Sequence, residues 1–188
     1  MAKRRSPRHM LGVAVTCVLI GLAASGWRDE WISAAQAMEV TPAPVRRLLI
    51  PVVGVTQQQL RDTFDEKRGD NAHEAIDIHA PRGTPVVATD DGRVVKLFHS
   101  VPGGLTIYQA DRANEFVYYY AHLDAYVDGL REGNVVKRGD VIGYVGSTGN
   151  ASPKAPHLHF AMLLLPPGKE WWKGTAINPF PLFTSSGP

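Results

Sequence analysis

The feature that most limits the fold of this chain is a series of short apolar or alternating segments separated by turns. The segments cover residues 48–53, 84–88, 93–98, 105–108, 116–120, 141–145 and 157–165. They are rich in β-branched and aromatic residues, and each has the length of a single strand. Glycine-containing turns follow at residues 91–92, 102–104, 138–140 and 147–150. The pattern predicts a mainly β, antiparallel domain in which only residues 56–64 look helical.

The beginning of the sequence has the features of an export signal. An apolar run over residues 10–24 follows four basic residues, Lys3, Arg4, Arg5 and Arg8. The run is shorter than the ~20 apolar residues of a spanning helix, but an uncleaved anchor stays an alternative. We expect residues 1–37 to be a signal peptide or an N-terminal membrane anchor. The protein is then exported to the periplasm or cell envelope, and the anchored form would associate with the inner membrane.

The rest of the chain has room for one ordinary domain. Residues 38–47 contain Pro42 and Pro44 and show no periodicity, which indicates a linker. We expect the domain over residues 48–182 and a short tail over residues 183–188.

Charge and cysteine content exclude several classes of function. The formal net charge is +2, but without the four basic residues of the signal, 16 basic residues face 18 acidic ones. The excess of basic residues therefore comes from the N-terminal signal, and we expect no nucleic-acid partner. The single cysteine, Cys17, lies inside the apolar run. A metal in the folded domain must then be bound by histidines and carboxylates.

Histidines occur in three patterns that suit a metal site. His73 and Asp77 stand four residues apart, a spacing that brings both side chains to one face of a helix or strand. His157 and His159 alternate with apolar residues, so a strand would point both imidazoles to one side. His122 ends an aromatic strand. Three protein ligands with an open position for water are typical of catalytic zinc, which would leave two histidines for acid-base or oxyanion roles.

Six motifs, in this order along the chain, carry a resemblance to a known family. They are His73-x-x-x-Asp77, Ala-Pro-Arg-Gly-Thr-Pro-Val at 80–86, Asp-Gly at 91–92, Tyr-Ala-His-Leu at 120–123, Gly-Asp-Val-Ile-Gly at 139–143 and Pro-His-Leu-His-Phe at 156–160. This region resembles the lysostaphin-type, LytM-like zinc endopeptidases. The resemblance implies a compact antiparallel β-sheet domain, the duplicated hybrid motif, with a groove across one sheet.

Position by position, the resemblance implies that His73, Asp77 and His159 bind one Zn²⁺ ion and that His122 and His157 are the catalytic histidines. The implied activity is hydrolysis of the peptide cross-links of bacterial peptidoglycan by a metal-activated water, with the peptide stems as the partner. The family often has glycine where this chain has Ala75. If that glycine takes a positive φ angle, alanine is disfavoured there.

Two other interpretations of the sequence lead to different functions. Some relatives of the family lack metal ligands and activate other cell-wall hydrolases, so a catalytically silent regulator is the alternative. Residues 136–143 resemble strands of biotinyl or lipoyl carrier domains, but such carriers need a lysine usually flanked by methionine, and no methionine here flanks a lysine.

We also expect Arg68, Trp171 and Trp172 to flank the groove, with the two tryptophans serving mainly in packing.

Overall fold

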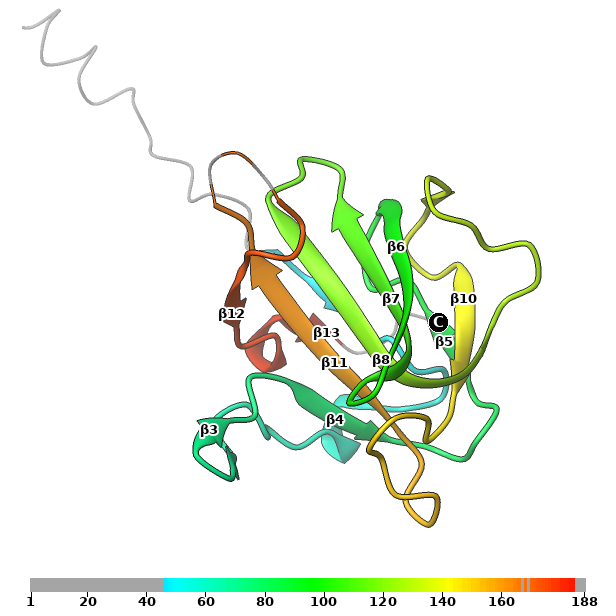
Figure 1. The fold of residues 1–188 in the computed structure, drawn as a ribbon, viewed down its shortest axis with the longest axis vertical. Helices are drawn as coiled ribbons and strands as arrows, with labels where there is room; N and C mark the ends of the chain where they lie inside the picture. Colours follow the sequence, from blue (N-terminus) through cyan, green and yellow to red (C-terminus); the bar gives the residue numbers. More distant parts are fainter. Residues whose placement is uncertain (1–45, 167, 169, 185–188) are drawn as a thin grey trace, which may run out of the picture. The chain divides into compact units, whose positions relative to one another are not determined.

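The computed structural model describes residues 46–166, 168 and 170–184 (Figure 1). The expected signal and most of the expected linker lie outside these residues. Within the described part, no helix has the length and apolar character needed to cross a membrane.

A nine-stranded sheet forms most of the domain, and every pairing in it is antiparallel. Its main order is β12-β11-β8-β7-β6-β9, while β4 pairs with β11, and β10 pairs with β5 and β8. The strands are β4 (Ile76–His79), β5 (Pro85–Val87), β6 (Gly92–Ser100), β7 (Gly104–Asp111), β8 (Phe116–Tyr126), β9 (Val135–Val136), β10 (Val141–Val145), β11 (His157–Leu164) and β12 (Thr175–Ile177). The expected mainly β, antiparallel fold is confirmed.

Helical structure is limited, among the described residues, to the 3-10 helices η1 (Gln57–Gln59) and η2 (Phe180–Leu182). The expectation of helix over residues 56–64 is therefore wrong beyond η1. None of the residues of η1 is buried, and Leu60 returns to an extended backbone with ψ 146°. A single turn without an apolar face against the core has nothing to extend it.

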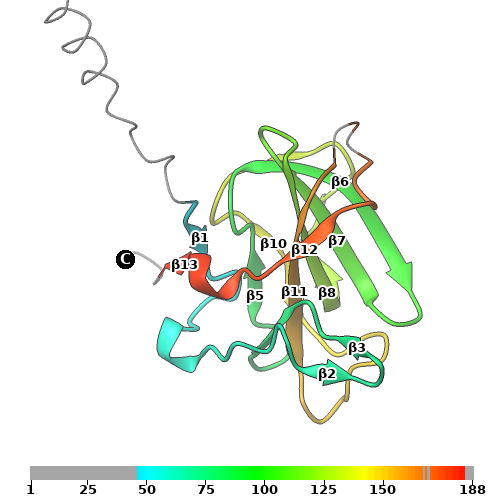
Figure 2. The same cartoon turned by 90° about the vertical axis from the view of Figure 1, so that its left-hand side faces the viewer.

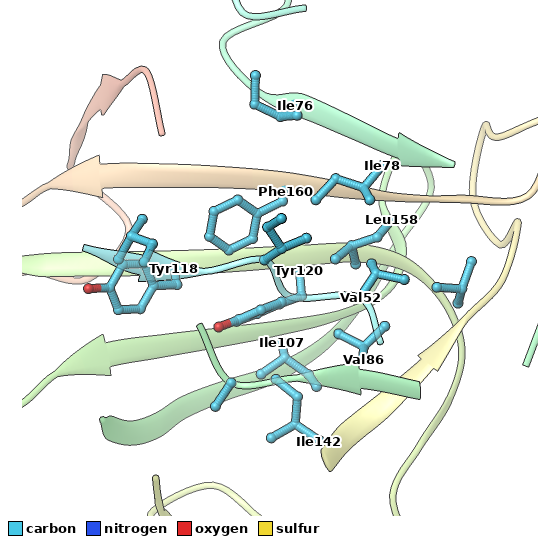
Figure 3. Close-up of a cluster of buried hydrophobic side chains, with 14 of the residues drawn as sticks. Val52, Ile76, Ile78, Val86, Ile107, Tyr118, Tyr120, Ile142, Leu158 and Phe160 are labelled. Atoms are coloured by element: carbon cyan, nitrogen blue, oxygen red, sulfur yellow. The ribbon is translucent and has the colours of Figure 1, made fainter. Parts of the chain in front are cut away.

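The core lies between the inward faces of these strands (Figure 3). On β11, Leu158, Phe160 and Met162 are at most 1% exposed, as strand alternation requires. Tyr118 and Tyr120 of β8 are also fully buried, and Phe160 packs edge-on against Tyr120. The hydroxyl of Tyr120 donates to Gln109 Oε1 at 2.7 Å and accepts from the Thr89 N–H at 3.0 Å. Its burial therefore leaves no polar atom unpaired.

The two ends of the described region are joined to each other. β1 (Leu48–Leu49) pairs in parallel with β13 (Phe183–Thr184), and Figure 2 shows them side by side. Phe183 is only 3% exposed. Arg46 forms ion pairs with Asp90 at 2.9 Å and Asp111 at 2.8 Å. These contacts extend the folded region by two residues beyond each expected boundary.

Candidate active site

Three side chains converge at one end of the sheet. His73 Nε2 lies 3.1 Å from Asp77 Oδ1 and 3.1 Å from His159 Nδ1, and these last two atoms are 3.2 Å apart. The structure thus brings together the three residues that the sequence proposed as ligands, and among the described residues they form a group able to hold a metal ion.

Strand register accounts for two of the three positions. β4 pairs with β11 so that Asp77 stands directly opposite His159. Ile76 and Ile78 on either side of Asp77 are buried, so alternation turns the carboxylate to the outer face of the sheet, where His159 also lies.

The third position depends on a hairpin formed by β2 (Lys67–Arg68) and β3 (Asn71–Ala72). At its base, the His73 N–H donates to the Glu66 carbonyl at 2.8 Å. Thr63 ties the hairpin to the site, because its carbonyl lies 3.0 Å from His73 Nδ1 and its Oγ1 accepts from the Asp77 N–H at 3.1 Å. Such contacts fix the orientation of metal-binding side chains.

The donor atoms fit a tetrahedral zinc ion. The Thr63 carbonyl can only accept, so His73 Nδ1 carries the hydrogen and Nε2 of the neutral ring presents a lone pair to Asp77 Oδ1. Lone pairs this close repel one another unless a cation lies between them. Zinc–ligand distances of ~2.0–2.1 Å in tetrahedral geometry separate ligand atoms by about 3.3 Å. The observed separations of 3.1 and 3.2 Å are close to this value.

The charge states of these residues also suit metal binding. Burial lowers the pKa of His73, which favours the neutral imidazole, although the nearby Asp77 raises it. Burial raises the pKa of Asp77, but the neighbouring His159, His73 and His157 outweigh burial and bring this pKa to about 2. A neutral imidazole and an ionised carboxylate are the forms that bind metal.

His122 reaches the same site through an irregular backbone. It has a φ angle of 61°, and the pairing of β8 with both β7 and β10 shifts register nearby. Tyr118 and Tyr120 face the core, so regular alternation would have sent His122 inward as well. The bulge instead turns it into the pocket beside Ala121.

His122 and His157 are oriented alike. Nδ1 of His122 lies 2.8 Å from the Thr148 carbonyl, and Nδ1 of His157 lies 2.9 Å from the Ala155 carbonyl. Each Nδ1 must therefore be the donor, which leaves Nε2 of each neutral ring as an acceptor. Burial lowers the pKa of His122 to about 4, so this ring is neutral at pH 7. Nε2 of His157 lies 3.8 Å from Asp77 Oδ1.

One pocket of about 450 Å³ is lined by all five candidate site residues, His73, Asp77, His122, His157 and His159. The lining includes Arg68 of the hairpin and also Asn150, Ala151 and Ser152 of the loop over residues 146–156. Figure 1 shows the hairpin and this loop at the two ends of β4. The pocket is the groove that the resemblance implied.

Several neighbouring residues have other positions. His79 stands opposite His157 in the β4–β11 register with the rings 5.3 Å apart, but it is exposed and does not line the pocket. Trp171 packs on Tyr108 with ring centres 4.8 Å apart, outside the pocket lining. Ala75 is fully buried and has no positive φ; the left-handed conformation lies at its neighbour Glu74, with φ 57°. The concern raised by alanine at this position does not apply.

The sequence did not indicate the polar groups that orient these histidines. The carbonyls of Thr63, Thr148 and Ala155 are backbone atoms, so no side-chain type marks them. The turn residues Gly69 and Asp70 indicate a hairpin, but they do not indicate that Arg68 Nη2 forms an ion pair with Asp77 Oδ2, 2.9 Å away.

Similar solved structures show the class of protein to which this fold belongs. The catalytic domain of the antimicrobial peptidase lysostaphin from Staphylococcus simulans superimposes with a TM-score of 0.54 and 30% identity, covering 64% of this chain and 87% of that one. Csd3 of Helicobacter pylori gives a TM-score of 0.58 and 29% identity, covering 75% of this chain and 34% of that one. The fold is that of a peptidase catalytic domain.

The family follows from the sequence. The profile of peptidase family M23 matches residues 71–179, and the chain belongs to this family.

Curated relatives include the L-Ala–D-Glu endopeptidase of Bacillus subtilis, 33% identical over an alignment of 148 residues that covers 74% of this chain and 41% of that protein. The DD-carboxypeptidase/endopeptidase Mpg of Neisseria meningitidis is 45% identical over 89 residues, which are 47% of this chain and 19% of that protein. The chain therefore spans less than half the length of these relatives.

Proposed function

We propose that this chain is a zinc-dependent endopeptidase that hydrolyses the peptide cross-links of bacterial peptidoglycan. The observation that carries the proposal is the convergence of His73, Asp77 and His159 at ligand distances, in a pocket that also contains two oriented histidines. Membership of peptidase family M23 and the names of the relatives support the substrate class.

His73 Nε2, Asp77 Oδ1 and His159 Nδ1 are the atoms that would hold the ion. Bound there, zinc would lower the pKa of a water molecule toward ~7 and polarise the scissile carbonyl. The chain itself supplies rigid placement: Thr63 fixes His73, and the β4–β11 register fixes Asp77 against His159.

His122 and His157 would handle the protons. With Nδ1 of each ring committed to a carbonyl, Nε2 is the atom that accepts a hydrogen bond from the attacking water. Burial lowers the pKa of His122 to about 4, which makes its protonated form a better proton donor than an ordinary imidazolium. That form is suited to return a proton to the leaving amine nitrogen.

We further propose that the bond cut lies between D-alanine and diaminopimelate, and not in a glycine bridge. The identity to the DD-carboxypeptidase/endopeptidase Mpg supports this choice. The short basic N-terminal signal is also typical of an envelope protein of Gram-negative bacteria. The chain would then act in the periplasm, either free or anchored to the inner membrane through residues 1–37.

A catalytically silent regulator is not favoured by the structure. Such a protein has no need of a complete site, whereas all five side chains are present and line one pocket.

Mass spectrometry of muropeptides tests the proposal. Purified zinc-loaded protein is incubated with diaminopimelate-type peptidoglycan and, separately, with glycine-bridged peptidoglycan. We expect loss of D-alanyl–diaminopimelate dimers in the first, abolished by a chelator and restored by zinc. Release of glycine-terminated fragments from the second, with D-alanyl cross-links left intact in the first, would contradict the choice of bond.

A further inference from the structure

Arg68 lies on the hairpin β2–β3 and contacts the metal-binding group through Asp77. Its strand pairs with β3 in the register Arg68 with Asn71, and Gly69 between them has a φ of 65°, which a tight two-residue turn requires. The base of the hairpin holds His73. The guanidinium is therefore carried on the same unit that places one of the three proposed ligands.

The guanidinium of Arg68 is only partly used by the protein. Nη2 contacts Asp77 Oδ2 at 2.9 Å and Glu66 Oε2 at 3.3 Å. Nε and Nη1 form no hydrogen bond with any residue in the described part of the chain, and the side chain is 51% exposed. Since an arginine has five N–H donors, several stay available to a ligand in the pocket.

Arg68 is also the only lysine or arginine among the residues that line the pocket, all of which the structure describes. The lining also has neutral polar side chains, those of Asn150 and Ser152. A half-exposed arginine with free donors favours a carboxylate, which it can bind through two parallel hydrogen bonds.

The substrate of the proposed function has such a group next to the bond that is cut. In a D-alanyl–diaminopimelate cross-link, the carbon that bears the scissile amide nitrogen also carries a free carboxylate, whereas a glycine bridge has none. We propose that Arg68 binds this carboxylate and makes the enzyme selective for cross-links in which it is not amidated. This inference rests on the proposed function and adds the recognition of a neighbouring anion to it.

The test compares two cross-linked peptide dimers that differ only at this group, one with the free carboxylate and one with the carboxamide. A hydrogen-bonded charge contact corresponds to ~10–100-fold in kcat/KM, so the zinc-loaded wild type is expected to prefer the free acid by about this factor. Arg68→Gln should cut both dimers at similar rates. The matched control, Lys67→Gln on the same strand, should keep the preference, since Lys67 is exposed and does not line the pocket.

The ratio between the two dimers separates recognition from a role in holding Asp77. Loss of zinc in Arg68→Gln would slow both reactions equally and leave the ratio unchanged, so zinc content is measured alongside. If turnover of the variant is too low to follow, calorimetric titration with the cleaved products, free acid and amide, measures the preference for the carboxylate as a ratio of Kd values.

Two results would overturn the inference alone: equal cutting of both dimers by the wild type, or a preference retained by Arg68→Gln. Failure of the wild type to cut either dimer would instead contradict the proposed function, and the inference with it.

Discussion

Strands β11 and β8 both deliver histidines to the pocket, but their backbones do so in opposite ways. β11 is regular, with Leu158 and Phe160 buried and His157 and His159 on the outer face. β8 follows the same rule as far as Tyr120 and then breaks it, since His122 has a positive φ at a register shift. The regular strand holds a proposed ligand, whereas the irregular one holds only a proposed catalyst.

The difference matters because a positive φ at a non-glycine residue costs free energy, commonly ~1–3 kcal/mol. The surrounding structure compensates for this cost: the His122 N–H donates to the Gly103 carbonyl at 2.8 Å, and the ring is bound to Thr148. Bulges are frequent beside active sites, where they re-aim a side chain. We therefore expect changes at β11 and changes at β8 to have different effects on zinc binding and turnover.

The largest effect is expected when a ligand is removed. His159→Ala, His73→Ala or Asp77→Ala leaves two of the three convergent atoms, so zinc and cross-link cleavage should be lost together. Zinc stoichiometry by elemental analysis and muropeptide release are measured on the same preparation. The wild type stripped with a chelator and reloaded with zinc serves as the control. A variant that kept both zinc and activity would remove its residue from the ligand set.

A smaller loss is expected at the two histidines that are not proposed as ligands. His122→Ala and His157→Ala keep all three ligand atoms, so zinc should stay bound while turnover falls ~10²–10⁴-fold. Circular dichroism confirms that each variant is folded. If His157→Ala lost its zinc while His159→Ala kept it, the roles within this pair would be reversed.

The contrast between the strands also explains which parts of the site could be predicted. Alternation alone placed His157 and His159 on one face, because the apolar residues between them must be buried. The direction of His122 could not be obtained in this way, since its φ angle depends on the pairing of β8 with β7 and β10. The sheet itself was predictable from the apolar runs. The helix expected over residues 56–64 is reduced to the 3-10 turn η1. Its length could not be predicted, because the sequence does not show that the side chains of η1 stay exposed.

A third prediction disturbs the bulge without touching any histidine side chain. A Cβ at Gly146 would lie 2.4 Å from the Asp124 backbone nitrogen and 2.7 Å from the His122 carbonyl oxygen. Gly146→Ala should therefore move the backbone of His122. A misplacement of about 1 Å can reduce turnover by up to ~10²-fold. Zinc binding should be kept, because β4 and β11 are paired elsewhere.

Gly174→Ala is the matched control for this variant. Its Cβ would lie 2.5 Å from Leu163 Cβ, so it is similarly crowded, but it is next to β12 and not at the bulge. Both variants should be destabilised, by ~1–3 kcal/mol from overpacking. For each variant, kcat is measured together with the folded fraction from denaturant unfolding. Only in Gly146→Ala should kcat fall by more than the loss of folded protein explains. Equal turnover in the two would show that the bulge does not set the position of His122.

The smallest effect on catalysis is expected when Trp171 or Trp172 is replaced, because these rings lie near the regular part of β8 and away from the bulge. Tyr119 points to the outer face, its ring centre lies 4.7 Å from that of Tyr108, and Trp171 covers Tyr108 at 4.8 Å. Trp172 contacts Trp171 at 5.1 Å but is 55% exposed. Neither tryptophan lines the pocket. If these rings serve in packing, Trp171→Ala should lower the free energy of unfolding by about 1–3 kcal/mol.

Trp172→Ala should cost less than Trp171→Ala, about 0.5 kcal/mol, because a largely exposed ring buries little area. KM for the cross-linked dimer should change by less than threefold in either variant, since the strand stays regular and His122 stays in place. Denaturant unfolding and steady-state kinetics are measured for both variants and for the double variant. The result that would contradict packing is a double variant with weaker substrate binding and an unchanged Tm, because the aromatic rings would then be contacting substrate instead of the sheet.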